Sequence, residues 1–244
     1  MMRKDIVWQG PELAKTFVEG IRGGIPFANE QIDIMLRLIA ANSAPVKQFA
    51  DLGCGNGVLA KAILSRYPEA SGILIDFSEP MMAQARTNLA SYANLRFVMA
   101  DLAASDWTAV MAHQPLLDVA VSAFAIHHLT HERKRELYGE VFNLLKPGGM
   151  FINIEHVASS TPWVESRFDD LMIDSLTAFH TRQGDEQSRE QVADDYRHRP
   201  DKTANILAPV ETQCTWLRDI GFGDVDCYLK SFELAVFGGR RSKE

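Results

Sequence analysis

Three glycines alternate with other residues in one short loop of this chain, Asp51-Leu52-Gly53-Cys54-Gly55-Asn56-Gly57. Glycine has no Cβ atom, so such a loop can turn tightly and approach a ligand closely. The apolar pair Phe49-Ala50 precedes the loop, and an apolar stretch over residues 58–64 follows it. A strand, a glycine loop and a helix N-terminus in this order are typical of a site for a nucleotide-like ligand.

Two further acids each follow an apolar run, where a nucleotide could meet them. Asp76 ends the run Ile73-Leu74-Ile75 and lies 19 residues after Gly57. This spacing is near the one at which an acidic residue meets a ribose hydroxyl in dinucleotide-binding folds. Asp101 follows a third apolar run. At both positions the structural alternative is a helix cap or a loop acid.

These motifs resemble those of the class I S-adenosylmethionine (SAM) dependent methyltransferases. The loop reads Gly-x-Gly-x-Gly, whereas a nicotinamide site more often reads Gly-x-Gly-x-x-Gly. The run Leu144-Leu145-Lys146-Pro147-Gly148-Gly149 is similar to the turn that the family has before its fifth strand. Four such signals follow in the family's order over residues 48–155. The resemblance implies a transferase that uses SAM and releases S-adenosylhomocysteine (SAH).

The resemblance also implies which residues bind the cofactor. The glycine loop would pass under the amino-acid part of SAM, which Asp51 would orient. Asp76 would accept hydrogen bonds from the ribose hydroxyls, and Asp101 would accept one from the adenine amine. The whole expected set is Asp51, Gly53, Cys54, Gly55, Asn56, Gly57, Asp76, Asp101 and Ser122, with Phe77, Met81 and Leu102 against the adenine ring.

Candidate catalytic residues follow the fourth and fifth predicted strands: His127, His128, Glu155 and His156. In sheets of this type, ligands bind beyond the carboxyl ends of the strands. Methyl transfer is an in-line displacement, so the protein chiefly holds the partners and excludes water. One of these side chains could take the proton of a hydroxyl or amine acceptor near neutral pH. Alternatively, the histidine pair only packs beside the cofactor. No close ligand spacing predicts a metal site.

The order of the apolar runs predicts an α/β fold. Between residues 46 and 155, apolar runs alternate with helical periods, which favours a parallel sheet with crossover helices. Near the C-terminus, a short connection favours an antiparallel strand pair. Together with the resemblance, this predicts a Rossmann-like, mostly parallel seven-stranded sheet with an antiparallel C-terminal strand and helices on both faces. The expected strands are 48–52, 72–76, 95–99, 117–123, 149–155, 222–228 and 232–237, and the expected helices include one N-capped by Ser78, one over 130–145 and one over 209–220.

Two segments outside this core are expected to cover the acceptor as a lid. Residues 1–45 form an N-terminal helical arm with apolar side chains between glycines, namely Trp8, Phe17, Ile21, Ile25 and Phe27. Residues 161–201 form a helical insertion rich in acids. For most of those acids the alternative is a solvated helix face. We expect a single methyltransferase domain over residues 1–244.

Composition restricts the partners and the compartment. The chain has 25 Lys and Arg against 32 Asp and Glu, a formal charge of −7. An acidic chain without a cationic cluster binds a phosphate backbone poorly, so we expect no direct nucleic-acid binding. Three cysteines without a CxxC pair favour a reducing cytoplasm. Neither a signal peptide nor a membrane span is expected, because no apolar stretch has the required form.

A narrower resemblance, to the tRNA wobble-uridine carboxy-SAM synthase group, covers most of the chain. It rests on Arg22-Gly23-Gly24-Ile25-Pro26 and on the tail from Asn205-Ile206-Leu207 to Gly221-Phe222. Those enzymes make carboxy-SAM from SAM and prephenate, and the resemblance implies an arginine for the new carboxylate, here Arg197 or Arg199. The glycine loop departs from that group, which has Gly-Cys-Ser-Leu-Gly at this place.

Four functions remain open from the sequence. The expected function is methyl transfer from SAM to a small-molecule acceptor. The alternatives are a carboxy-SAM synthase, a SAM-binding subunit without catalysis, and a tRNA or protein methyltransferase. A homodimer is compatible with the resemblance. The sequence identifies neither the acceptor nor the kind of atom that is methylated.

Overall fold

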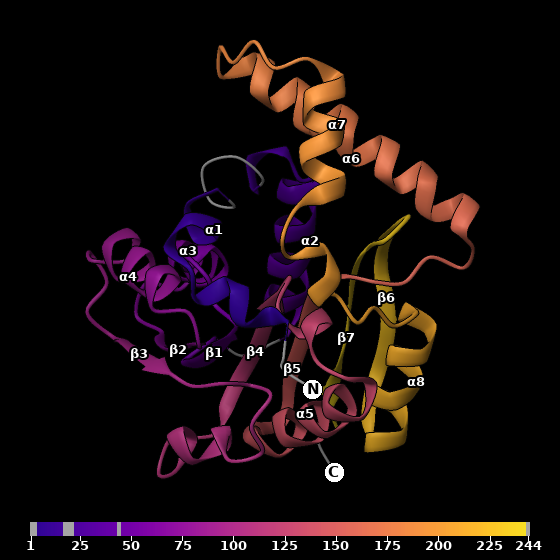
Figure 1. Ribbon diagram of the computed structural model, residues 1–244. Helices are drawn as coiled ribbons and strands as arrows, with labels where there is room; N and C mark the ends of the chain where they lie inside the picture. Colours follow the sequence, from indigo (N-terminus) through magenta and orange to yellow (C-terminus); the bar gives the residue numbers. More distant parts are fainter. Residues whose placement is uncertain (1–3, 17–21, 43–44, 243–244) are drawn as a thin grey trace.

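A seven-stranded sheet forms the centre of the computed structural model, which describes residues 4–16, 22–42 and 45–242 (Figure 1). The strand order is β3-β2-β1-β4-β5-β7-β6. Strand β7 runs antiparallel to both of its neighbours, and the other pairs are parallel, which confirms the predicted sheet. The strands are β1 (Gln48–Leu52), β2 (Ser71–Asp76), β3 (Leu95–Met99), β4 (Leu117–Ala123), β5 (Leu145–His156), β6 (Phe222–Ser231) and β7 (Leu234–Arg241).

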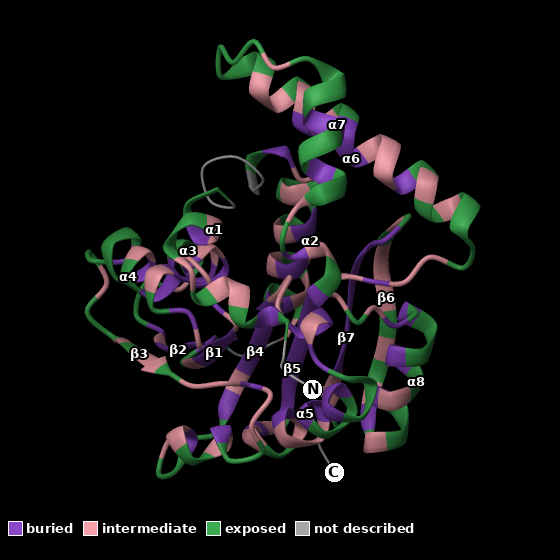
Figure 2. Ribbon diagram, viewed as in Figure 1, coloured by how far each residue is buried: buried purple, intermediate pink, exposed green. Residues whose placement is uncertain are grey.

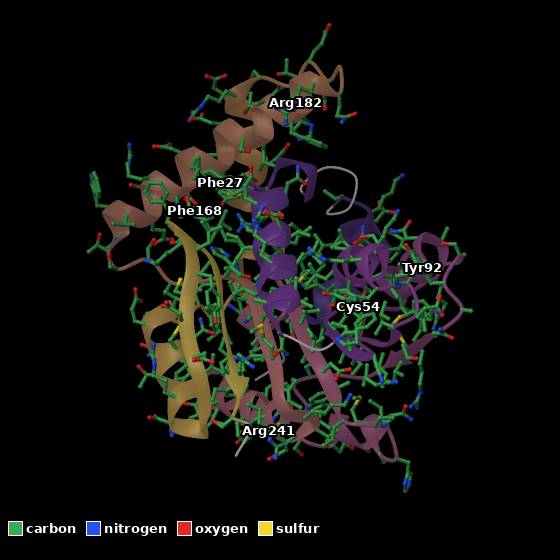
Figure 3. All side chains as sticks on the ribbon, turned by 180° about the vertical axis from the view of Figure 1, so that it is seen from behind. Phe27, Cys54, Tyr92, Phe168, Arg182 and Arg241 are labelled. Carbon is green, nitrogen blue, oxygen red and sulfur yellow. The ribbon has the colours of Figure 1, made fainter. Side chains whose placement is uncertain are left out.

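Helices cover both faces of the sheet. Helices α5 and α8 lie in front of it in Figure 1, and α2 lies in front of it in the reverse view of Figure 3. Alternate residues of the central strands point to opposite faces of the sheet, and each face has its own hydrophobic core. Phe49 packs with α2 and α3, whereas Ala50 and Leu52 pack with α5 and α8. The α-helices are α1 (Pro11–Thr16), α2 (Ala28–Ala41), α3 (Val58–Arg66), α4 (Glu79–Asn88), α5 (His131–Leu144), α6 (Pro162–Arg182), α7 (Arg189–His198) and α8 (Val210–Ile220). The 3-10 turns are η1 (Asp5–Gln9), η3 (Arg22–Gly24), η4 (Trp107–Met111), η5 (Ile126–His128) and η6 (Lys202–Ala204). None of the helices in the described part of the chain is both long and apolar enough to cross a membrane.

The start of β5 differs from the prediction. Helix α5 ends at Leu144 and β5 begins at the next residue, so the expected turn at 146–149 lies within the strand. Leu117 pairs with Leu145, but Val119 pairs with Met150, and the register therefore shifts between the two pairs. An irregularity of this kind accommodates the Pro-Gly-Gly sequence inside a strand. The predicted strand 149–155 thus begins four residues too late.

Helices α6 and α7 project beyond the carboxyl end of β5 (Figure 1). They form a small core of their own around Phe168, Ile173, Val192 and Tyr196. Their outer surfaces are exposed, and the buried side chains lie where the two helices meet (Figure 2). The predicted helical segment over 161–201 is therefore present, while its role as a lid stays a prediction.

The N-terminal arm packs against α6 at two adjacent glycines of η3. A Cβ atom on Gly23 would lie 2.2 Å from the ring of Phe179, and one on Gly24 would lie 2.6 Å from the side chain of Leu176. Only residues without a side chain fit here, which explains the Gly-Gly pair in the sequence. Of the apolar arm residues expected to contribute to a lid, Phe17 and Ile21 lie outside the described residues.

Candidate functional site

The carboxyl ends of the central strands open into a first cavity of about 850 Å³, measured with its open mouth. Ten of the twelve residues expected to bind a cofactor line this cavity: Asp51, Gly53, Cys54, Gly55, Asn56, Asp76, Phe77, Met81, Asp101 and Leu102. The topology thus gathers these ten residues from three separate segments around one space.

The glycine loop is held in place by the strand beside it. The backbone N–H groups of Gly53 and Cys54 both donate to the carbonyl of Ile75. Gly55 has a φ of +52°, which favours glycine, and no atom lies within 4 Å of the position that its Cβ would take. The loop therefore presents an open backbone surface to the cavity.

Asp76 anchors the loop from the end of β2. Its Oδ2 atom accepts from the N–H of Gly55 at 2.8 Å, and its Oδ1 atom accepts from the N–H of Ser78 at 2.8 Å. The residue is only 7% exposed, and burial raises the pKa of its carboxyl group. Each carboxylate oxygen can accept a second hydrogen bond. Asp76 can therefore shape the loop and still receive donors from a ligand.

Asp51 has a structural role that sequence reasoning missed. Its Oδ2 atom accepts from the N–H of Ala60 at 3.1 Å, in the first turn of α3. The N-cap residue of that helix, Gly57, has no side chain for this purpose. A helix begins with N–H groups that need acceptors, and a buried carboxylate at this end is favourable.

Two residues of the expected cofactor set do not line the cavity. Ser122 is fully buried, and its hydroxyl donates to the carbonyl of Leu52 at 2.7 Å, between β4 and β1. Gly57 starts α3 instead of facing the space. Both residues build the elements around the cavity, and their contact with a cofactor stays a prediction.

The N-terminal arm reaches the same cavity, which was only partly expected. Asp5 and Trp8 of η1 are among its lining residues. Ser78 stands at the N-cap of α4 as predicted, but its hydroxyl donates to the carbonyl of Trp8 at 2.6 Å instead of capping the helix. The aromatic residue in the arm was a signal for this contact, whereas nothing in the sequence singled out Asp5.

A second cavity of about 610 Å³ adjoins the first, and Trp8 and Phe124 line both. Phe124 has a φ of +51°, an uncommon conformation for a residue with a side chain. Helix α6 lies over this cavity and carries Phe168, which is labelled in Figure 3. The remaining lining residues are Ile25, His127, His156, Met172, Tyr196, Arg199, Asp201, Asn205 and Leu234.

The structure brings the four candidate catalytic residues together, with the ring centre of His127 3.9 Å from that of His128 and 5.7 Å from that of His156, but the histidines face two different cavities. His127 and His156 line the second cavity, His128 lines the first, and Glu155 is fully buried behind them. The Nδ1 atom of His127 lies 2.6 Å from Oε1 of Glu155. Burial lowers the pKa of His127 well below its ordinary value and raises the pKa of Glu155. His127 is thus neutral near pH 7, and Glu155 orients its ring from the Nδ1 side.

The other two histidines have different surroundings. Burial lowers the pKa of His128 to about 3, so this ring is also neutral, beside the first cavity. The Nε2 atom of His156 lies 2.6 Å from Oε2 of the buried Glu233, at the start of β7. Glu233 was missed by sequence reasoning, because it is brought to His156 only by the antiparallel pairing of β5 and β7.

Lys134 is a further residue that the sequence did not indicate. Its fully buried amine donates to the backbone carbonyls of His127, Leu129 and Ile206. Burial lowers its pKa to about 8. The amine ties the turn that carries His127 to the segment before α8. Within the described residues, no group of three or more His, Cys, Asp or Glu side chains is placed to hold a metal ion.

Comparison with known proteins finds similarity to methyltransferases over the part of the chain that carries this arrangement. A methyltransferase-domain family model matches residues 49–149, which include the glycine loop, Asp76 and Asp101. The chain is 32% identical over 125 residues to trans-aconitate 2-methyltransferase of Acidovorax ebreus (strain TPSY), across 51% of this chain. The matched part is 44% of that enzyme.

Residues 49–149 of the chain are similar to a methyltransferase domain.

Two further comparisons extend the similarity over most of the chain. It is 23% identical over 256 aligned positions to the carboxy-SAM synthase of a Nitratiruptor species, across 100% of both chains. Its fold is similar to that of the N-methyltransferase NodS from Bradyrhizobium japonicum WM9, solved with SAH (TM-score 0.56, 16% identity, 88% of each chain).

Proposed function

We propose that the chain transfers a methyl group from SAM to a small-molecule acceptor. The observation that carries this proposal is the pair of adjoining cavities with Trp8 and Phe124 in common. A cofactor in the first cavity and an acceptor in the second would meet across these two side chains. SAM supplies the methyl group on an electrophilic sulfonium, so the chain must chiefly align the partners and exclude water.

The residues of the first cavity fit SAM. The open face at Gly55 leaves room for the amino-acid part of the cofactor along the loop. Asp76 would accept from the ribose hydroxyls with the free lone pairs of its two oxygens. Asp101 would accept from the adenine amine, and Phe77, Met81 and Leu102 would lie against the adenine ring.

His127 is the proposed general base, and Glu155 is its positioning residue. The contact at Nδ1 leaves Nε2 of the neutral ring as the basic nitrogen. For a hydroxyl or amine acceptor, Nε2 would receive the proton that the acceptor loses as it takes the methyl group. His128 lines the cofactor cavity and would pack beside SAM. The N-terminal arm, α6 and α7 would together form the lid that excludes water.

Mass spectrometry of the purified protein tests the cofactor assignment. The native spectrum gives the oligomeric state and the mass of any bound molecule, and denaturation then releases that molecule for identification. We expect SAM or SAH in the site. Absence of both, together with no SAH binding by calorimetry, would refute the proposal. A SAM-binding subunit would bind the cofactor but show no transfer in an acceptor screen.

Carboxy-SAM synthesis is the second candidate, favoured by the match along the whole of both chains. Of the two arginines considered for its carboxylate, Arg197 is exposed, and Arg199 lines the second cavity. The same mass spectrum separates the two functions, because a released ligand heavier than SAM by a carboxyl group would favour the synthase.

A further inference from the structure

The polar groups of the second cavity differ in whether the protein already satisfies them. Arg199 is engaged on three sides: its Nη1 donates to the carbonyl of Tyr196 at 2.7 Å, its guanidinium lies 4.3 Å from the centre of the Tyr196 ring, and its Nε lies 3.5 Å from Oδ2 of Asp201. Its charge is therefore matched by the carboxylate of Asp201. The nearby Lys202 faces Asp169 at 3.6 Å.

Two acceptor atoms at this cavity have no hydrogen-bond partner among the described residues. They are Oδ1 of Asp201 and Oδ1 of Asn205, and both atoms are buried. Asp201 as a residue is only 9% exposed and lines the cavity. Buried polar atoms in proteins almost always have a partner, and a carboxylate oxygen can only accept. A group that carries N–H or O–H donors would satisfy both.

Apart from His127 and His156, the rest of the wall is apolar. Phe168, Met172 and Leu234 are buried or nearly so, and the aromatic rings of Phe124 and Tyr196 complete the surface. His127 is neutral, since burial lowers its pKa. A carboxylate in this cavity would face Oδ1 of Asp201 and would have to compete with Asp201 for Arg199. The cavity therefore disfavours an anionic ligand.

We propose that the second cavity takes an acceptor with an apolar, ring-sized body and an amine or hydroxyl group that donates to Asp201 and Asn205. This proposal rests on the proposed function, because it names the acceptor class for the same site. The proposal also predicts that carboxylate substrates, including a dicarboxylic acid, bind poorly in this cavity.

Three matched probes test the class: 2-phenylethylamine, 2-phenylethanol and 3-phenylpropionate, each titrated by calorimetry with and without SAH. We expect the amine and the alcohol to bind at least about tenfold more tightly than the carboxylate. A carboxylate that binds as tightly as the amine would overturn the proposal, and so would a lack of binding by all three. SAH binding is measured in a separate titration, and a failure to bind SAH would refute the proposed function. The relative affinities of the three probes, measured without SAH, would still test the acceptor class.

Substitutions at position 201 locate the effect. In the parent, the charge of Asp201 should make the amine bind more tightly than the alcohol, because hydrogen bonds between charged groups are stronger. Asp201→Asn keeps an acceptor oxygen but removes the charge, so this preference should disappear while the alcohol still binds. Asp201→Leu should lose both ligands. Asp194→Asn makes the same change on the exposed side of α7 and should alter nothing. An unchanged amine-to-alcohol ratio in Asp201→Asn would contradict the proposal, provided that SAH affinity and melting temperature match the parent.

Discussion

The carboxylate of Asp76 holds two backbone N–H groups, one in the glycine loop and one at the start of α4, before any ligand is considered. Asp51 similarly accepts a hydrogen bond from a backbone N–H group in the first turn of α3. The acids that are expected to meet the cofactor are therefore also the acids that fix the loops around it. Single side chains of this kind give the first cavity its shape.

Asp76→Ala should weaken SAH binding by at least about tenfold. The change removes the ribose acceptor and leaves two buried N–H groups unpaired, and hydrogen bonds to a charged group are worth roughly 1.5–3 kcal/mol each. Calorimetry with SAH measures the effect. A mutant that binds SAH as the parent does would show that the ribose assignment is wrong.

Gly55→Val should abolish SAH binding, because a branched side chain would enter the open space along the loop and would strain a backbone with φ of +52°. Gly184→Val is the matched control: Gly184 also has a positive φ and open surroundings, but it lies in an exposed turn after α6. The control should lose some stability and keep its SAH affinity. Equal SAH affinity of the two variants would contradict the loop placement.

The activity of the parent should fall only at acidic pH. The pKa of His127 lies well below 6.5, so the ring stays unprotonated and able to accept a proton through the neutral range, and it loses this ability as the pH falls through that lowered pKa. The acid limb of the kcat/KM profile should therefore lie below pH 6.5. His127→Gln should reduce kcat and remove the limb while SAH affinity is retained. If the acid limb is unchanged in His127→Gln, a residue other than His127 is the general base.

Contacts between elements decide how the two cavities are enclosed. Turn η3 lies against α6 through Gly23 and Gly24, and the amine of Lys134 joins η5 to the segment before α8. Helix α6 in turn covers the second cavity with Phe168 and Met172. The arm is therefore packed against α6 beside the second cavity, and a lid role for the two stays a prediction.

Gly23→Ala should destabilise the protein by about 1–3 kcal/mol, because the new methyl group would overlap the ring of Phe179. Phe179→Leu in the same chain should recover part of the loss, since it removes ring atoms from the crowded position. Denaturant unfolding of the two single mutants and the double mutant gives the coupling between them. Additive effects would show that η3 and α6 do not contact each other in solution.

The whole molecule joins distant parts of the chain around the proposed ligands. The first cavity is lined from η1 to the residues after β4, and the second adds residues from α6, α7, the segments on either side of η6, and β7. A ligand that binds only the folded chain stabilises all of these parts together.

SAH at a hundredfold excess over its Kd should raise the free energy of unfolding by about 2.7 kcal/mol. For a chain of this size, that corresponds to a rise in melting temperature of roughly 5–10 °C. Differential scanning fluorimetry measures the shift, and Asp76→Ala at the same SAH concentration should show little of it. No shift in the parent would contradict cofactor binding in the first cavity.

The sequence alone determined the sheet and most of the first cavity. Apolar runs, a glycine loop and acids after strands are local signals, and parallel strands carry the residues at their carboxyl ends to one edge. Hence Asp76 and Asp101 were predicted from their place after β2 and β3. The boundary of β5 was not, because a proline and two glycines predict a turn unless a neighbouring strand accommodates them.

Only the tertiary structure decided the roles within the site. The sequence did not distinguish the roles of the four candidate catalytic residues. The fold pairs His127 with Glu155 and His156 with Glu233. It also placed Asp201 beside Arg199 at the second cavity, with one oxygen unpaired. These pairings join residues far apart in the chain, and local pattern carries no information about them. Burial then set the protonation of His127, which depends on the assembled surroundings and not on the neighbours in sequence.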